Sequence, residues 1–174
     1  VAVVKDSFPE RRPALRLPEK NAGEENIIRY LEKERGIERS VIEHFINAGT
    51  LYEEKESHNP VFVGMDEKQI PRFAHVRSTR EKRRMDVTGS DKRYGFSHTG
   101  NSEELFVFEA AIDLLSFVSI YPKDWEQHHY VALGGVSERA MKHYLEQREE
   151  IKKVTLCLDD DPAGEEGCRK LLQY

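Results

Sequence analysis

Three short stretches decide the fold of this chain: residues 105–113 (LFVFEAAID), residues 131–137 (VALGGVS) and residues 156–164 (LCLDDDPAG). Each opens with a continuous apolar run, which is typical of a short strand buried in a sheet. A segment with helical periodicity follows each run. Because strand and helix alternate three times, the pattern predicts βαβ units and a parallel sheet flanked by helices.

The residues before these stretches predict a smaller α+β unit. Apolar residues at helical spacing favour helices over about 24–34 and 40–49. The short apolar runs at 51–52, 61–63 and 73–76 suit an antiparallel sheet. The glycine-containing region from 89 to 100 is interpreted as a loop. The expected organisation is a linker or tail, an α+β subdomain with a basic segment, and an α/β domain, at residues 1–20, 21–101 and 102–174.

Composition limits the class of protein. The chain has 174 residues, of which 38% are hydrophobic and 34% charged, so it can bury a core. Its longest apolar stretch is interrupted by Glu109 and Asp113, which excludes a membrane span, and its amino terminus lacks the features of a signal peptide. Cys157 and Cys168 form no CxxC pair, so neither a disulfide framework nor zinc bound by this chain alone is expected. We expect a cytoplasmic protein with no membrane partner.

Positive charge is concentrated in one segment of an otherwise acidic chain. Residues 68–93 hold nine basic and three acidic residues, a net charge of +6, whereas the whole chain carries −5. Such asymmetry is typical of a patch that neutralises phosphates, and it also fits a solvated basic loop. The nine are Lys68, Arg72, Arg77, Arg80, Lys82, Arg83, Arg84, Lys92 and Arg93.

Acidic residues follow two of the predicted parallel strands. Glu109 closes the first strand, and Asp159 and Asp161 follow the third. Right-handed crossovers bring these strand ends to one edge of the sheet, and Asp113 lies one helical turn beyond Glu109. Converging carboxylates need a counter-ion, and Mg²⁺ fits best because it uses few carboxylates and binds phosphates. The alternative is that the aspartates simply cap the last helix.

Taken together, the three stretches resemble successive motifs of the Toprim domain, which DnaG-type primases, type IA and II topoisomerases and related nucleases share. The family has a glutamate closing its first strand, a glycine-containing turn after the second, and a DxD followed by a small residue and glycine. Residues 27–45, 59–77 and 90–96 resemble the polymerase core of primases. The likeness is greatest to primase-like Toprim proteins of mobile and conjugative elements, with the last Toprim strand expected to lie beyond residue 174.

This resemblance implies a Toprim-like, Rossmann-type parallel sheet preceded by a primase-core-like α+β subdomain. It gives Glu109 and Asp113 catalytic roles and assigns Mg²⁺, or Mn²⁺ as a substitute, to Asp159, Asp161 and Glu109. Template or nucleotide phosphates would contact basic residues: Arg77, Arg80, Arg83, Lys92 and Arg93.

The function that the resemblance implies is that of a primase-like nucleotidyltransferase in replication or transfer of a mobile element. A Toprim nuclease, or a catalytically degenerate module that binds DNA or serves as a scaffold, remains the alternative. The expected partners are single-stranded DNA or another nucleic acid, nucleoside triphosphates, and helicase or relaxase-type domains of a longer protein.

Overall fold

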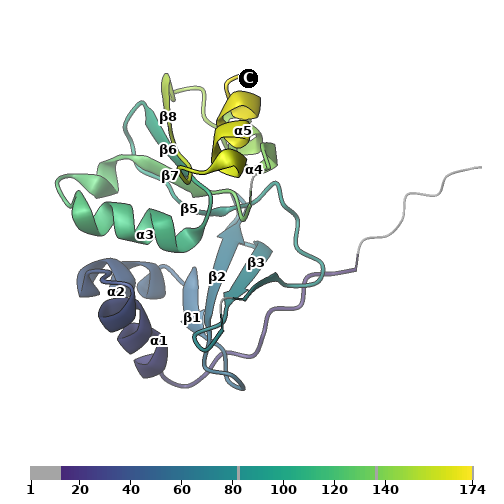
Figure 1. Cartoon of the computed structure of the whole chain (residues 1–174). Helices are drawn as coiled ribbons and strands as arrows, with labels where there is room; N and C mark the ends of the chain where they lie inside the picture. Colours follow the sequence, from purple (N-terminus) through teal and green to yellow (C-terminus); the bar gives the residue numbers. More distant parts are fainter. Residues whose placement is uncertain (1–12, 82, 136, 174) are drawn as a thin grey trace, which may run out of the picture.

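The computed structural model describes residues 13–81, 83–135 and 137–173, which form two four-stranded sheets with helices packed against them (Figure 1). The first sheet is antiparallel and follows chain order, as the sequence predicts. Its strands are β1 (Leu51–Glu53), β2 (Pro60–Met65), β3 (Pro71–Arg77) and β4 (Arg84–Asp86).

Helices precede this sheet, as expected from the apolar spacing. α1 (Glu25–Arg29) continues directly into the π-helical turn η1 (Tyr30–Glu34), and α2 (Arg39–Asn47) follows. Ile27, Leu31 and Ile42 are fully buried, so the predicted apolar faces do meet the core.

The second sheet contains the predicted parallel strands in the order β5-β7-β6-β8. β6 (Glu104–Phe108) lies between β7 (His129–Ala132) and β8 (Lys153–Cys157), and both pairings are parallel. The segments between and after the strands carry α3 (Ala111–Ile120), the 3-10 turn η2 (Trp125–Gln127), α4 (Arg139–Glu146) and α5 (Pro162–Leu171). The predicted α/β fold is therefore confirmed.

The interpretation of residues 89–100 as a loop is wrong in one place. β5 (Phe96–His98) pairs antiparallel with β7, so a segment before residue 102 belongs to the second sheet. β5 has only three residues, too few to show the alternation of apolar and polar residues that predicts a strand. Its extended conformation is instead determined by its pairing with β7. A Cβ atom at Gly95 would lie 2.2 Å from the carbonyl oxygen of Ala132, so a residue without a side chain allows this approach.

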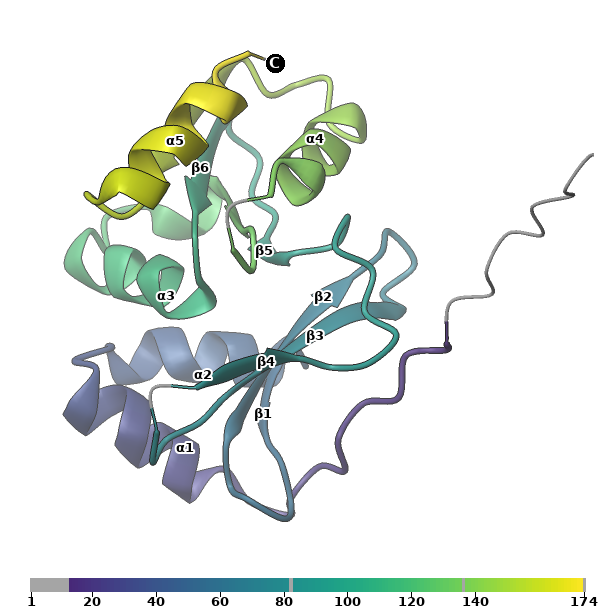
Figure 2. The ribbon, with the colours of Figure 1, turned by 45° about the vertical axis from the view of Figure 1, so that its right-hand side comes forward.

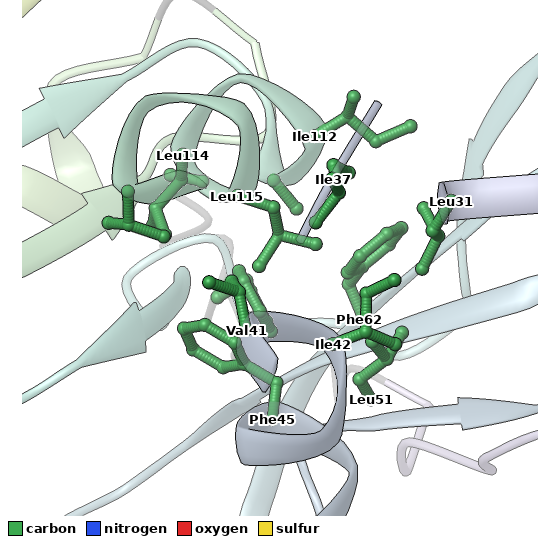
Figure 3. Close-up of a cluster of buried hydrophobic side chains, with 14 of the residues drawn as sticks. Leu31, Ile37, Val41, Ile42, Phe45, Leu51, Phe62, Ile112, Leu114 and Leu115 are labelled. Carbon is green, nitrogen blue, oxygen red and sulfur yellow. The ribbon is translucent and has the colours of Figure 1, made fainter. Parts of the chain in front are cut away.

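One hydrophobic core joins the two sheets. Val41 and Phe45 of α2 lie opposite Leu115 of α3, and Phe62 of β2 and Phe108 of β6 belong to the same buried cluster (Figure 3). The helices that cover the first sheet therefore also support the second.

Of the expected tail, residues 1–12 lie outside the described part of the chain. The described residues 13–20 contact the first sheet. Tyr52 Oη donates a hydrogen bond to the Pro18 carbonyl at 2.8 Å, and Lys20 forms a β-bridge with Glu54. Within the described residues, no helix has the length and apolar character that a membrane crossing requires.

Candidate active site

A cleft lies where the carboxyl ends of β6 and β8 meet the first sheet. It encloses about 190 Å³, and Figure 2 shows the second sheet with its helices above the first sheet. The charged and titratable residues lining it come from strands of the first sheet and from segments outside the strands: His75, Arg77 and Arg84, and Arg35, Asp113 and Asp159. Positively and negatively charged side chains therefore line the same cleft. The cleft lies at the edge of the sheet where open α/β folds bind ligands.

Glu109 closes β6 beside this cleft and is 9% exposed. The Nη2 group of Arg84 on β4 donates a hydrogen bond to its Oε1 atom at 3.1 Å. The backbone of Glu109 is held as well, because the Gly135 amide donates to its carbonyl at 3.2 Å. Gly134 and Gly135 have φ of 67° and 127°, a conformation that favours glycine, so the glycine turn after β7 positions the end of β6.

Asp113 stands in the first turn of α3 and points back to the start of that helix. Its Oδ2 atom accepts a hydrogen bond from the Ala110 amide at 3.2 Å. Burial raises the pKa of Asp113, and the negative charges of Asp159 and Glu109 raise it further. Asp159 and Glu109 therefore both lie close enough to Asp113 to affect its charge.

Asp159 and Asp161 follow β8 and differ in their surroundings. Asp159 lines the cleft, whereas Asp161 is the N-cap of α5, with Oδ1 accepting from the Gly164 amide at 2.8 Å. The alternative that the aspartates cap the last helix thus holds for Asp161. Only Oδ1 of its carboxylate takes part in the capping hydrogen bond. A Cβ atom at Gly164 would lie 1.9 Å from the Asp159 carbonyl oxygen, which explains why glycine follows the aspartates.

The structure separates the basic residues that the sequence groups together. Arg77 lines the cleft, and its Nε atom is buried without a hydrogen-bond partner among the described residues. Lys92 pairs with Asp86 at 2.7 Å and Arg93 with Asp91 at 2.7 Å, so both are engaged within the chain. Arg80 and Arg83 line a different hollow of about 570 Å³, and Lys82 lies outside the described residues.

Comparison with known families and structures agrees with this geometry. Residues 106–174 match the family described as Toprim-like. This part of the chain is a Toprim-like domain. Residues 29–102 match a family described as a protein of unknown function, DUF3991. The Toprim-like domain thus begins within β6 and contains Glu109, Asp159 and Asp161.

Solved structures with the same fold are catalytic cores of primases. The primase fragment of the bacteriophage T7 primase-helicase protein has a TM-score of 0.63 and 19% identity, covering 80% of this chain and 58% of its own. The E. coli primase catalytic core has a TM-score of 0.56 and 16% identity, covering 86% of this chain and 60% of its own. At these identities the likeness shows the fold.

A curated relative is the uncharacterized protein pXO2-78 of Bacillus anthracis, which is 26% identical over 159 residues. The match covers 83% of this chain and 46% of the relative, so the chain spans about half the length of that protein.

The carboxylates of the Toprim-like domain fit a particular kind of metal site. Among the described residues, no three His, Cys, Asp or Glu side chains converge closely enough to hold an ion, so the expected convergence is not found. Mg²⁺ usually keeps several waters and uses only one or two carboxylates together with substrate phosphates. Asp113 lies near the negative charges of Asp159 and Glu109, and these few carboxylates suit such an ion better than they suit a cage built only of protein ligands.

Three of the charged and titratable residues that line the cleft were not assigned to it from the sequence: Arg35, His75 and Arg84. Arg84 belongs to the basic segment, but nothing in the sequence marks it as the partner of Glu109. His75 faces Asp86 across β3 and β4, with Nδ1 3.0 Å from Oδ1. Because β4 was not expected, this cross-strand pair could not be read from the sequence.

Proposed function

We propose that this chain is the core of a Mg²⁺-dependent nucleic-acid enzyme of primase type, a nucleotidyltransferase. The observation that carries this proposal is the cleft in which Asp113 and Asp159 face three arginines of the other wall. Guanidinium groups suit the binding of phosphate oxygens, and carboxylates suit a divalent cation that bridges them. A nucleoside triphosphate with its cation combines both requirements.

The proposed roles are assigned to residues that line the cleft, and to Glu109 and Asp161 near lining residues in the sequence. Asp159 and Asp161, with Glu109 beside them, would hold the Mg²⁺, which when bound neutralises charge on the reacting phosphates. Arg77 would donate to a phosphate oxygen, because its buried Nε atom has no acceptor among the residues that the structure describes. Asp113 would support the metal ligands from the first turn of α3.

The nucleic-acid template would lie along the first sheet. Arg80 and Arg83 are exposed beside the hollow next to β4, and Lys92 and Arg93 lie in the following segment. Contacts of this kind position a strand through its phosphates without reading its sequence. We further propose that helicase or relaxase-type domains accompany this core in a longer protein of a mobile element. The T7 structural neighbour is itself part of a primase-helicase protein.

A second candidate function is a binding module that has lost catalysis. The ion pair between Arg84 and Glu109 favours it, since this arginine occupies an oxygen of the carboxylate expected to act in catalysis. Such a module would bind DNA through the same basic residues and would not require Mg²⁺.

The experiment is template-directed synthesis by the full-length protein, with nucleoside triphosphates and Mg²⁺ or Mn²⁺. Primer formation that Glu109→Gln and Asp159→Asn each abolish would support the proposal, with Glu165→Gln, an exposed charge change on α5, as the matched control. Cleavage of DNA without incorporation would identify a nuclease instead. DNA binding that ignores Mg²⁺ and survives Asp161→Asn, without synthesis or cleavage, would identify the binding module.

A further inference from the structure

His75 faces the candidate active site from the first sheet. It lies on β3, is 9% exposed, and lines the cleft together with Arg77, Asp113 and Asp159. Neither the proposed metal site nor the proposed phosphate contacts use it. A titratable side chain buried at the edge of such a cleft calls for a chemical explanation.

Asp86 fixes the orientation of the His75 ring, and Lys92 in turn holds Asp86. Asp86 Oδ1 lies 3.0 Å from Nδ1, and Lys92 Nζ lies 2.7 Å from the other oxygen of the same carboxylate. Although burial alone would raise the pKa of Asp86, the hydrogen bonds from Lys92 and His75 lower it, so the carboxylate stays ionised. An ionised acceptor at Nδ1 requires the proton there and leaves the lone pair on Nε2.

Charged groups from several neighbouring elements lie around the ring. Burial lowers the pKa of His75, Asp86 raises it, and Arg84 and Arg77 lower it, with a net decrease. The ring is therefore neutral near pH 7. The charged groups around it are Asp86 and Arg84 on β4, Lys92 beyond β4, Arg77 on β3, Arg35 after η1, Asp113 on α3 and Asp159 after β8.

We propose that Nε2 of His75 accepts the proton of the hydroxyl group that attacks phosphorus in this cleft. This inference rests on the proposed function and adds a catalytic residue to it. The hydroxyl O–H bond breaks and its proton moves to Nε2. The oxygen forms a bond to the α-phosphorus, and the bond from that phosphorus to pyrophosphate breaks, with the electron pair leaving on pyrophosphate.

The carboxylates in and beside the cleft are less suited to accept this proton, because each has a hydrogen-bond partner or a proposed role in metal binding. Glu109 accepts a hydrogen bond from Arg84, and Asp113 accepts one from the backbone amide that begins its own helix. Asp159 is exposed and is proposed to hold the metal. His75 instead combines a neutral ring with a fixed orientation, as a general base requires.

The test compares His75→Asn with the wild type in the full-length protein. Asparagine can keep an N–H group directed at Asp86 but has no atom in place of Nε2. Single-turnover nucleotidyl transfer would be measured from pH 5 to pH 9, and we expect the rate at pH 7.5 to fall about 100-fold or more. The wild-type rate should decline below the His75 pKa, which lies under its usual 6.5, and this decline should disappear in the variant.

Further variants separate a catalytic role from a structural one. Asp86→Asn should reduce the rate about 10- to 100-fold by loosening the ring. Free imidazole should partly restore His75→Ala, which a merely structural role would not allow. His128→Gln is the matched control, because His128 precedes β7 at the opposite end of the strands. Thermal melting of each variant would show that it remains folded.

A measurement without catalysis checks the geometry. Nitrogen-15 NMR of the histidine rings should show the Nδ1–H tautomer for His75, and Asp86→Asn should change that signal. The Nε2–H tautomer would overturn the proposal.

The kinetic outcomes are equally distinct. If the wild type is active, a rate for His75→Asn within twofold of the wild-type rate, with an unchanged pH profile, would overturn the role of His75 and leave the proposed function standing. So would loss of the acid decline in Asp113→Asn but not in His75→Asn. A wild type that neither joins nor cleaves phosphodiester bonds, despite the expected NMR signal, would overturn the proposed function and this step with it.

Discussion

Arg84 Nη2 lies 3.1 Å from Glu109 Oε1, so an arginine of the first sheet holds the carboxylate that closes β6 of the second sheet. The Glu109 side chain is 12% exposed and that of Arg84 is 45% exposed. A cation approaching this carboxylate meets a positive charge already in place. The ion pair therefore links the two halves of the molecule and also opposes metal binding at Glu109.

Removal of the arginine charge should strengthen metal binding. We expect Arg84→Gln to bind Mn²⁺ at least about fivefold more tightly than the wild type at low ionic strength, because a unit charge near the ion is lost. Titration calorimetry would measure this affinity. Arg83→Gln is the control, since Arg83 is exposed and lines the separate hollow. Equal affinities in the two variants would show that Glu109 does not contribute to the ion site.

Asp161 should contribute to stability and to metal binding in ways that two substitutions separate. Asn caps a helix about as well as Asp, whereas Ala does not. Asp161→Ala should lower the free energy of unfolding by about 1 kcal/mol, and Asp161→Asn should leave it nearly unchanged. Both should weaken Mn²⁺ binding because both remove the charge. If Asp161→Asn binds Mn²⁺ like the wild type, Asp161 is a cap and no ligand.

Gly164 should tolerate no side chain. The Cβ atom of alanine would overlap the Asp159 carbonyl oxygen, so the segment carrying Asp159 must move. We expect Gly164→Ala to destabilise the protein by about 1–3 kcal/mol and to weaken Mn²⁺ binding. Chemical denaturation and calorimetry would measure the two effects, with Glu165→Ala, an exposed neighbour, as the control. An unaltered metal affinity would indicate that Asp159 does not bind the ion.

Glu53 should make the first sheet sensitive to acid. Its buried carboxylate accepts hydrogen bonds from the backbone amides of Asn26 and Ile27 at 3.0 and 3.1 Å. Although burial opposes the charge, side-chain hydrogen bonds from Asn26 and His58 and the Ile27 amide lower the pKa of Glu53 below its usual 4.5. This stabilisation is complete above the unfolded pKa and is lost as the pH falls through the folded pKa.

Glu53→Gln should therefore reduce stability by about 1.5–3 kcal/mol at pH 7, a loss that shrinks below about pH 4. Urea unfolding at a series of pH values would measure the difference between variant and wild type. Glu56→Gln, an exposed change in the adjacent turn, should have almost no effect. A difference for Glu53→Gln that stays constant from pH 7 to pH 3 would contradict the role of its charge.

The parallel half of the fold could be predicted from the sequence because its signals are local. Buried strands such as β6 appear as continuous apolar runs, and the aspartates after β8 follow such a run directly. Adjacent parallel strands then bring their carboxyl ends together, which correctly located Glu109 and Asp159 at one edge of the sheet. Their roles as metal ligands stay predictions.

The opposite wall of the cleft could not be predicted, because tertiary contacts create it. β4 and β5 have three residues each and are defined by their partners in the sheets. Arg84 and His75 reach the cleft only because the first sheet docks against the second. Nothing in their sequence neighbourhood distinguishes them from surface residues or from the core of a strand.

The core shared by α2 and α3 makes the two family segments interdependent in folding. Recombination that separated residues 29–102 from 106–174 would expose Phe45 and Leu115 to water at the same time as it divided the cleft. Each fragment would then present an apolar surface to water and be prone to aggregate. Neither half is therefore expected to persist in solution once its partner has been removed.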